Sequence, residues 1–355
     1  MSSGRSPTPM RRAGILVAGI AAGLALCIAP PGGSLATAAP GHRPKALPAQ
    51  VYAPYFETYQ PGSITTTARR SGVHYYTLAF LQATRRHPCA VYWNGVSQDP
   101  VSKAQYLSQI STLRARGGDV IPSFGGYTAD HDGTELADAC TKVGSIAADY
   151  EQVVRIYGVS RLDFDIEDNS LGHVAGVTRR DKAIALLETW ARARHLPLQV
   201  SFTMPATATG LATTGLAVLA NAARNGTRVD VVNIMTFDYF DGTTKMGTAA
   251  IAAGTALHAQ LAKLYPHKTS AQLYAMEAIT LLPGIDDNPS KAEVTTLADA
   301  RQVTTWAEKQ HLAMLSIWAI QRDNGGCPGT VDNDSCSGVA QKPWAFSDIL
   351  RGIDR

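Results

Sequence analysis

The sequence predicts an α/β fold, a (β/α)8 TIM barrel that forms a single domain. Eight short apolar, β-branched or aromatic runs alternate with stretches of helical periodicity. This alternation is typical of a parallel sheet, and about 300 residues suit either an eight-stranded barrel or a doubly wound sheet. The doubly wound alternative expects a GxGxxG turn after the first strand. No glycine occurs between Phe56 and Gly62, and this favours the barrel.

The expected strands and helices alternate along the whole body of the chain. The strands are expected at 51–56, 74–82, 119–124, 161–166, 198–204, 230–236, 273–280 and 313–319. The helices are expected at 103–116, 135–157, 175–195, 211–224, 246–265 and 292–310. Apolar residues in 292–310 recur at spacings of three and four, and Ser290 could cap the start of this helix.

The charge balance excludes two classes of protein. The 355 residues contain 32 Lys plus Arg and 29 Asp plus Glu, a net charge of +3. Three arginines and no acid lie in residues 1–38, so the remainder carries 32 − 3 = 29 basic against 29 acidic residues. The zero net charge of residues 39–355 excludes a nucleic-acid binder with a basic surface. It also excludes a polybasic protein that binds a membrane surface. An apolar content of 45% is enough for a sizeable core.

The N-terminus has the features of a secretory signal. Arg11 and Arg12 end a basic region, residues 13–29 form an uncharged apolar run, and small residues at 36–38 offer a cleavage site. The apolar run is shorter than the roughly 18–20 residues needed to span a bilayer. We therefore expect a signal peptide at 1–38, a short Pro-rich linker at 39–49, a catalytic barrel at 50–355, and a secreted protein without stable membrane association.

Four cysteines remain after the expected cleavage, and an even number in a secreted chain suggests two disulfides. Cys327 and Cys336 flank a loop rich in Gly, Asp and Asn, so they are expected to pair. This leaves Cys89 with Cys140. No CxxC or HExxH motif is present, so no metal or redox site is predicted.

The segment 162–167, Leu-Asp-Phe-Asp-Ile-Glu, carries the chemistry. Strand side chains alternate between faces, so Asp163, Asp165 and Glu167 share one face and the apolar residues share the other. In a barrel, the three acids would point inward and end at the C-terminal mouth. Closely spaced carboxyls raise one another's pKa values, so this cluster is suited to general acid catalysis. A Ca²⁺ or Mg²⁺ site or a structural polar cluster are the alternatives.

Asp163-x-Asp165-x-Glu167 resembles the DxDxE signature of family 18 glycoside hydrolases, the chitinase family. Three other stretches resemble family motifs, and they occur in the expected order. Ser123–Gly126 resembles the SxGG motif, Met235–Tyr239 resembles the motif that ends strand six, and Ser316–Trp318 resembles the last strand. Two further stretches, 282–287 and 318–323, resemble a bacterial secreted chitinase branch. The resemblance covers roughly residues 50–352.

Two positions depart from the family pattern. Ser160 and Arg161 occur where the full motif begins with Asp-Gly, and Phe237 occurs where Tyr is usual. Tyr239 would then have to supply the missing hydroxyl from a neighbouring direction.

The resemblance implies catalysis assisted by the substrate. Glu167 would protonate the leaving oxygen and then activate water, while Asp165 would orient the 2-acetamido group of the substrate. Asp163 would share a proton with Asp165. Tyr239, helped by Asp238, would hydrogen-bond the acetamido oxygen. The residues expected at the substrate-binding site are Trp318, Ser123, Met235, Met204 and Tyr55.

The expected function is that of a monomeric chitinase that acts on chitin or N-acetylglucosamine oligosaccharides, without a cofactor or metal. One alternative is an endo-β-N-acetylglucosaminidase that cuts the core of N-glycans by the same mechanism. The other is a non-catalytic chitin-binding lectin on the same barrel. Such lectins typically lack the terminal acid of the signature, whereas Glu167 is present here.

Overall fold

A computed structural model describes residues 44–286, 293–331 and 334–354, so the expected signal peptide lies outside the described residues. Parallel strands form a closed (β/α)8 barrel, as predicted. Their order around the barrel is β1-β13-β10-β9-β7-β6-β5-β3-β2. The strands are β1 (Val51–Tyr52), β2 (Tyr55–Glu57), β3 (Tyr75–Thr84), β5 (Asp119–Gly125), β6 (Arg161–Asp165), β7 (Gln199–Thr207), β9 (Val231–Met235), β10 (Glu277–Leu281) and β13 (Met314–Ile317).

The first barrel strand is divided between two neighbours. Its first half, β1, pairs with β13, and its second half, β2, pairs with β3. The division falls at Pro54, which has no N–H to donate. The carbonyl of Ala53 there accepts hydroxyl hydrogen bonds from Thr77 of β3 (3.2 Å) and Ser316 of β13 (2.9 Å). These side-chain bonds join the two edges of the sheet and close the barrel.

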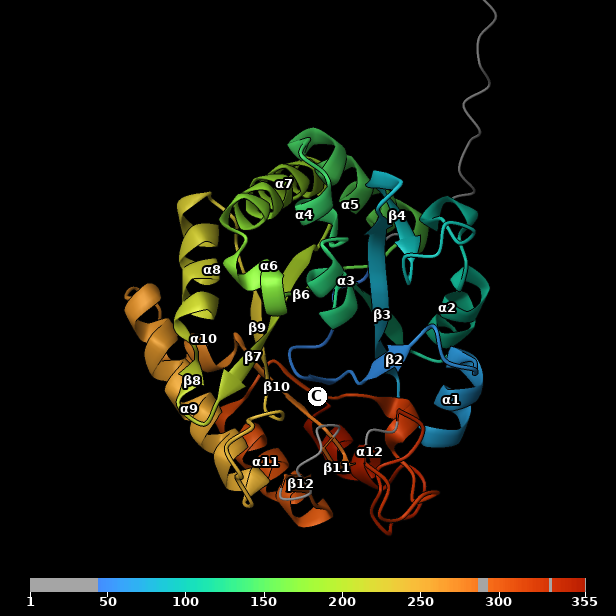
Figure 1. The fold of residues 1–355 in the computed structure, drawn as a ribbon, viewed down its shortest axis with the longest axis vertical. Helices are drawn as coiled ribbons and strands as arrows, with labels where there is room; N and C mark the ends of the chain where they lie inside the picture. Colours follow the sequence, from blue (N-terminus) through green and yellow to red (C-terminus); the bar gives the residue numbers. More distant parts are fainter. Residues whose placement is uncertain (1–43, 287–292, 332–333, 355) are drawn as a thin grey trace, which may run out of the picture. The chain divides into compact units, whose positions relative to one another are not determined.

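Most helices lie around the outside of the strands, whereas α3 and α6 are seen inside this ring, beside β6 (Figure 1). They are α1 (Ile64–Ser71), α2 (Leu107–Arg114), α3 (Tyr127–Asp132), α4 (Leu136–Ala139), α5 (Val143–Tyr157), α6 (Asp168–Gly172), α7 (Val174–Arg192), α8 (Thr213–Arg224), α9 (Met246–Leu264), α10 (Ser270–Tyr274), α11 (Leu297–Gln310) and α12 (Ala345–Leu350). In the part of the chain that the structure describes, no helix combines the length and apolar character needed to cross a membrane.

Four short strands lie outside the barrel sequence of strands in the described part of the chain. The strand β4 (His87–Trp93) runs antiparallel to β3, β8 (Gly210–Leu211) pairs with the end of β7, and β11 (Gly284–Ile285) pairs with β12 (Val294–Thr295). Three single turns of 3₁₀ helix complete the elements: η1 (Val101–Lys103), η2 (Ile320–Arg322) and η3 (Arg351–Ile353).

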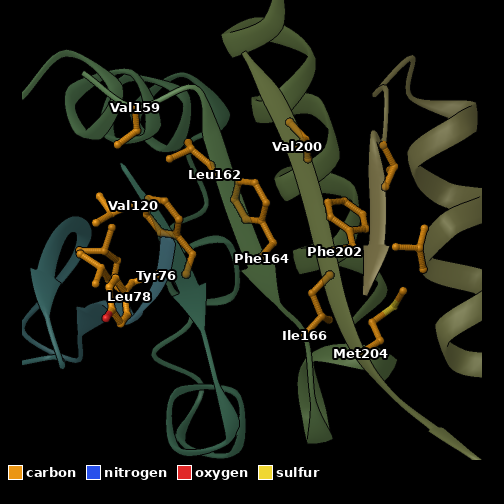
Figure 2. Close-up of a cluster of buried hydrophobic side chains, with 14 of the residues drawn as sticks. Tyr76, Leu78, Val120, Val159, Leu162, Phe164, Ile166, Val200, Phe202 and Met204 are labelled. Atoms are coloured by element: carbon orange, nitrogen blue, oxygen red, sulfur yellow. The ribbon is translucent and has the colours of Figure 1, made fainter. Parts of the chain in front are cut away.

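The main core fills the layer between the strands and the helices. Leu162, Phe164 and Ile166 follow one face of the β6 segment and pack beside the apolar residues of neighbouring strands (Figure 2). The ring of Phe164 stacks on Phe124 of β5 with centroids 5.4 Å apart. This outward apolar face confirms the alternation expected for 162–167, and it directs the acids of that segment to the interior of the barrel.

Both predicted disulfides are present. Cys89 of β4 is joined to Cys140, which directly follows α4, with Cα atoms 4.8 Å apart. Cys327 is joined to Cys336, with Cα atoms 6.0 Å apart. The first bond ties the β4 hairpin to the segment between β5 and β6.

Two expected element boundaries were wrong because of helix caps. The strand expected at 273–280 begins only at Glu277, since a capping box of Thr269 and Gln272 starts α10 just before it. The helix expected at 292–310 begins at Leu297, where Thr296 and Asp299 form a capping box. Ser290, the expected cap, lies outside the described residues. The short helix α1 and the strand β4 were not predicted.

Candidate active site

The carboxylate of Asp163 lies inside the barrel and is held by four hydroxyl groups. Its Oδ2 accepts hydrogen bonds from Tyr55 (3.1 Å) and Ser123 (2.7 Å). Its Oδ1 accepts from Ser201 (2.7 Å) and Thr203 (2.9 Å). The donors come from β2, β5 and β7, so these bonds cross the interior. Burial raises the pKa of Asp163, and the four hydroxyl donors oppose this rise.

This arrangement defines what Asp163, Tyr55 and Ser123 do. Both oxygens of Asp163 accept hydrogen bonds from protein hydroxyls. The carboxylate is therefore a buried anchor that holds the strands carrying these hydroxyls. Tyr55 and Ser123 were expected at the substrate-binding site, but both side chains are buried and bonded to Asp163. Within residues 44–286, 293–331 and 334–354, no group of three or more His, Cys, Asp or Glu side chains is arranged to hold a metal ion.

Asp165 and Glu167 line a cavity of about 750 Å³ above this anchor. Asp165 is only 2% exposed, and its Oδ1 has no hydrogen-bond partner among the described residues. Burial raises the pKa of Asp165 well above its ordinary value, and the nearby Glu167, Asp163 and Asp130 add to the rise. These causes favour the protonated form of Asp165 more than in an ordinary aspartate.

The cavity is lined by acids, amides and aromatic rings. Its lining residues are Tyr59, Phe80, Gln82, Asn94, Val96, Tyr127, Thr128, Asp165, Glu167, Met235, Phe237, Asp238, Phe240, Trp318 and Asp334. Of the residues predicted from the sequence, the structure brings Asp165, Glu167, Met235, Asp238 and Trp318 to this cavity.

Trp318 packs against aromatic neighbours on one wall of the cavity. Its ring stacks on Phe80 with centroids 5.5 Å apart and planes at 15°, and it meets Tyr55 at 5.3 Å. Phe80 was not predicted. Gly126 lies against the ring of Phe80. A Cβ atom at Gly126 would come within 2.5 Å of that ring, and the Gly126 backbone φ of +83° also favours glycine. The second glycine of Ser123–Gly126 is thus required for the close approach of the loop to the cavity wall.

Tyr239 does not reach the cavity, although Asp238 beside it does. Asp238 and Phe240 have left-handed backbones, with φ of 52° and 54°. These conformations interrupt the strand-like alternation after β9, so Phe237, Asp238 and Phe240 all line the cavity. Tyr239 is buried and packs with Met246 and Ala249 at the start of α9. The structure therefore does not bring the Tyr239 hydroxyl to the place where the family resemblance expects it.

Met204 also lies away from the cavity. It is fully buried in the layer between strands and helices, on the same face of β7 as Val200 and Phe202 (Figure 2). The residues that alternate with it, Ser201 and Thr203, face inward and bond to Asp163. Met204 is a core residue by position, because its register along β7 directs it outward.

Arg161, at the position where the family has glycine, lies on the inward face of β6 at the start of the strand. It is 2% exposed, and its Nε and Nη2 atoms donate to Gln199 Oε1 at 3.2 and 2.8 Å. Burial lowers the pKa of Arg161 to about 10, while Asp230 and Asp163 oppose this decrease. The substitution thus places a buried cation two residues before Asp163 on the same face of the strand.

Glu57 and Tyr59 form a pair at the cavity that was not predicted. Glu57 ends β2 with no exposed surface, and its Oε1 accepts a hydrogen bond from the Tyr59 hydroxyl at 2.6 Å. The Tyr59 ring is 48% exposed at the cavity. Alternation from the inward-facing Tyr55 would have placed Glu57 on the inner face as well. Burial raises the pKa of Glu57 to about 7, and the Tyr59 bond opposes the rise.

Comparison with known proteins agrees with this geometry. The family model of glycosyl hydrolases family 18 matches residues 49–295, which include Asp165 and Glu167. The chain belongs to this family. Its barrel and its DxDxE strand are therefore those of a family 18 member.

Three known proteins are similar to this chain. A probable bifunctional chitinase/lysozyme of Escherichia coli (strain K12) is 33% identical over 320 residues, which are 86% of this chain and 35% of that protein. Endochitinase 11 of Metarhizium anisopliae is 33% identical over 290 residues, 79% of this chain and 53% of that protein. The chain thus spans about a third to a half of these relatives. The crystal structure of the catalytic domain of a hyperthermophilic chitinase from Pyrococcus furiosus is 28% identical, with a TM-score of 0.76 over 87% of this chain and 96% of that one.

The buried Glu57 predicts a pH dependence of stability. Its pKa rises from 4.5 in the unfolded chain to about 7 in the fold, so the folded state keeps a proton that the unfolded state loses between these values. The stabilisation is complete below pH 4.5 and is lost as pH rises to about 7. We expect Glu57→Gln, which keeps an acceptor for Tyr59, to remove up to about 3 kcal/mol of this decrease in the free energy of unfolding.

Urea unfolding at several pH values between 4 and 8 measures this difference. Glu151→Gln on the outer helix α5 is the matched control and should follow the wild-type pH profile. Parallel profiles for wild type and Glu57→Gln would contradict the prediction.

Proposed function

We propose that the protein is a chitinase that hydrolyses β-1,4 bonds between N-acetylglucosamine units. The observation that carries this proposal is the placement of Asp165 and Glu167 together at a cavity with an aromatic wall at Trp318. Aromatic faces stack on sugar rings, and a carboxyl pair supplies the proton transfers of glycoside hydrolysis. The chitinase names of the relatives support the choice of substrate.

The acetamido group of the substrate is the nucleophile in the proposed mechanism. An ordinary retaining glycosidase uses an ionised carboxylate as its nucleophile, and family 18 is an exception that uses its substrate. The raised pKa of Asp165 supports the exception, because a protonated carboxyl is a poor nucleophile. The acetamido oxygen attacks the anomeric carbon as the leaving oxygen takes a proton from Glu167. An oxazolinium ion results, and water activated by Glu167 opens it with retention.

Asp165 orients the acetamido group. In this proposal its proton passes to Asp163, which the family resemblance expects to share it, so that the ionised Asp165 stabilises the cationic intermediate. Its Oδ1 is buried at the cavity and has no hydrogen-bond partner among the described residues, so it is available to the acetamido N–H. Asp163 supports this role from below, since its hydroxyl partners keep the strand β6 in register with β5 and β7. Asp238, which lines the cavity, is closer to the substrate in this proposal than Tyr239.

Glu167→Gln is expected to lower turnover of a chitin hexamer by about 10²–10⁴, because it removes the general acid. Binding of the hexamer, measured by calorimetry, should change by no more than about threefold. Glu151→Gln on α5 serves as the control for expression and folding. Wild-type turnover in the Glu167→Gln protein would refute the assignment of the acid.

Asp165→Asn is expected to cost about 10²–10³ in rate, the typical effect of losing one well-placed transition-state contact. Substrate assistance also predicts that wild type leaves cello-oligosaccharides, which lack the acetamido group, uncut. Proton NMR of fresh product should show retained β configuration. Cleavage of cello-oligosaccharides, or an inverted product, would exclude this mechanism.

Product analysis decides between the substrates. We expect chitin oligomers to be cut, and a high-mannose glycopeptide incubated in parallel to remain intact. Release of the glycan from the glycopeptide alone would identify an endo-β-N-acetylglucosaminidase. Binding of chitin oligomers without any cleavage would identify a lectin instead.

We also propose that the enzyme is secreted. The basic and apolar leader in residues 1–38 supports this, and the two disulfides are typical of an oxidising compartment. Mass spectrometry of the exported protein should find Ala39 at its N-terminus. A protein that stays in the cell and starts at Met1 would contradict this expectation.

A further inference from the structure

Asp130 of α3 is a buried carboxylate directed at the backbone of Glu167. It has no exposed surface, and its Oδ2 accepts a hydrogen bond from the Glu167 N–H at 2.5 Å. Its Oδ1 has no partner within the described part of the chain and lies beside Gly125, 3.4 Å from where a Cβ of that residue would be. Asp130 does not line the cavity, so it is placed to act on Glu167 and not on a substrate.

The Glu167 amide needs such a partner because regular pairing ends before it. The ladder between β5 and β6 ends at the pair Gly125 and Asp165, and Gly126 N–H then bonds to the Asp165 carbonyl. On the other side, Ile166 N–H bonds to Thr203 of β7. Glu167 is the N-cap of α6, whose first N–H groups have no acceptor within the helix. Asp130 supplies an acceptor for this N–H at the base of the candidate acid.

Two further contacts join α3 to α6 at the same place. His131 and Asp168 pair at 2.7 Å, and the Asn169 amide donates to the His131 carbonyl at 3.1 Å. The His131 and Asp168 side chains are 58% and 33% exposed, so water weakens their interaction. The bond from Asp130 is the buried one of the three and forms in a low-dielectric environment, where hydrogen bonds are stronger.

A buried cation lies near Asp130. Arg180 of α7 has no exposed surface and pairs with Glu135 at 3.4 Å. Burial and then Glu135 raise the pKa of Asp130, whereas Arg180 and the bond from the Glu167 amide oppose this rise. The Asp130 carboxyl is therefore buried near this charge pair and bonded to the backbone that follows β6.

We propose that Asp130 is a positioning residue, which holds the Glu167 amide and thereby sets the direction in which the Glu167 carboxyl enters the cavity. The inference rests on the proposed function, in which Glu167 is the general acid. Catalytic groups must be held within about 0.5 Å of their working geometry. A displacement of about 1 Å can cost 10²-fold in rate. The left-handed Asp168, with φ of 38°, follows Glu167 directly and is part of the same fixed turn.

Three variants separate positioning from general stability. Asp130→Ala removes the acceptor, and Asp130→Leu removes it while keeping a similar volume. Asp130→Asn keeps an acceptor oxygen for the Glu167 amide. Asp132→Ala, on the same helix, is the matched control, since Asp132 is half-exposed and pairs only loosely with the exposed Arg85 at 3.5 Å.

On a chitin hexamer, we expect Asp130→Ala and Asp130→Leu to lower kcat by about 10–100-fold, with KM changed no more than about twofold. Asp130→Asn and Asp132→Ala should stay within about threefold of wild type. On 4-nitrophenyl chitobioside, whose leaving group needs little help from an acid, the loss in Asp130→Ala should shrink to about threefold or less. Equal losses on both substrates, or an Asp130→Asn protein as impaired as Asp130→Ala, would overturn the proposal.

Hydrogen exchange tests the bond without any need for activity. The Glu167 amide should exchange at least about tenfold faster in Asp130→Ala and Asp130→Leu than in wild type. Its exchange rate should be unchanged in Asp130→Asn and Asp132→Ala. Unaltered exchange in every variant would refute the positioning role. If wild type cleaves no N-acetylglucosamine substrate, the proposed function fails, while the exchange rates still decide whether Asp130 holds Glu167.

Discussion

The carboxylate of Asp163 connects the barrel wall to the site above it. Its four hydroxyl partners come from three strands, and Thr203 passes the network on to Asn233 of β9, which also bonds to Thr280 of β10. A buried carboxylate costs free energy unless such donors satisfy it. Replacing it would leave several hydroxyls without their acceptor. This polar layer fixes the height and direction of β6, so the next inward residue, Asp165, emerges at the cavity instead of in the core.

Above this layer, the site is built from loops that are themselves fastened to the strands. The glycine turn after β5 lets α3 lie against the end of β6, where Asp130 reaches the Glu167 amide. The exposed Tyr127 at the start of α3 stacks on His131, with centroids 5.7 Å apart. The same short helix therefore carries both a ring at the cavity and the support of the candidate acid. A shift of α3 would change both together.

The sequence predicts the parts of the molecule that follow from strand alternation. The eight strands follow from short apolar runs between helical stretches. The inward direction of Asp163 and Asp165 and the outward direction of Phe164 follow from a period of two. Met204 obeys the same rule: it alternates with the inward Ser201 and Thr203, so it lies in the core and not at the substrate-binding site where it was expected. Tyr239 could not be placed in this way, because the left-handed backbone of Asp238 interrupts the alternation. The roles of Asp130 and Arg180 could not be predicted from the sequence for another reason. Their contacts join segments that are far apart in the chain, and no local pattern marks them.

The divided first strand has a consequence for how the protein is made. The two edges of the sheet meet where β1 pairs with β13, and there the Ala53 carbonyl accepts a hydrogen bond from Ser316, 263 positions later in the chain. Tyr52 is held in turn by Asp354, 302 positions away. A ribosome must therefore synthesise nearly the whole domain before the barrel can close, and contacts of such sequence separation form slowly. Until then, the two edges of the sheet remain unpaired.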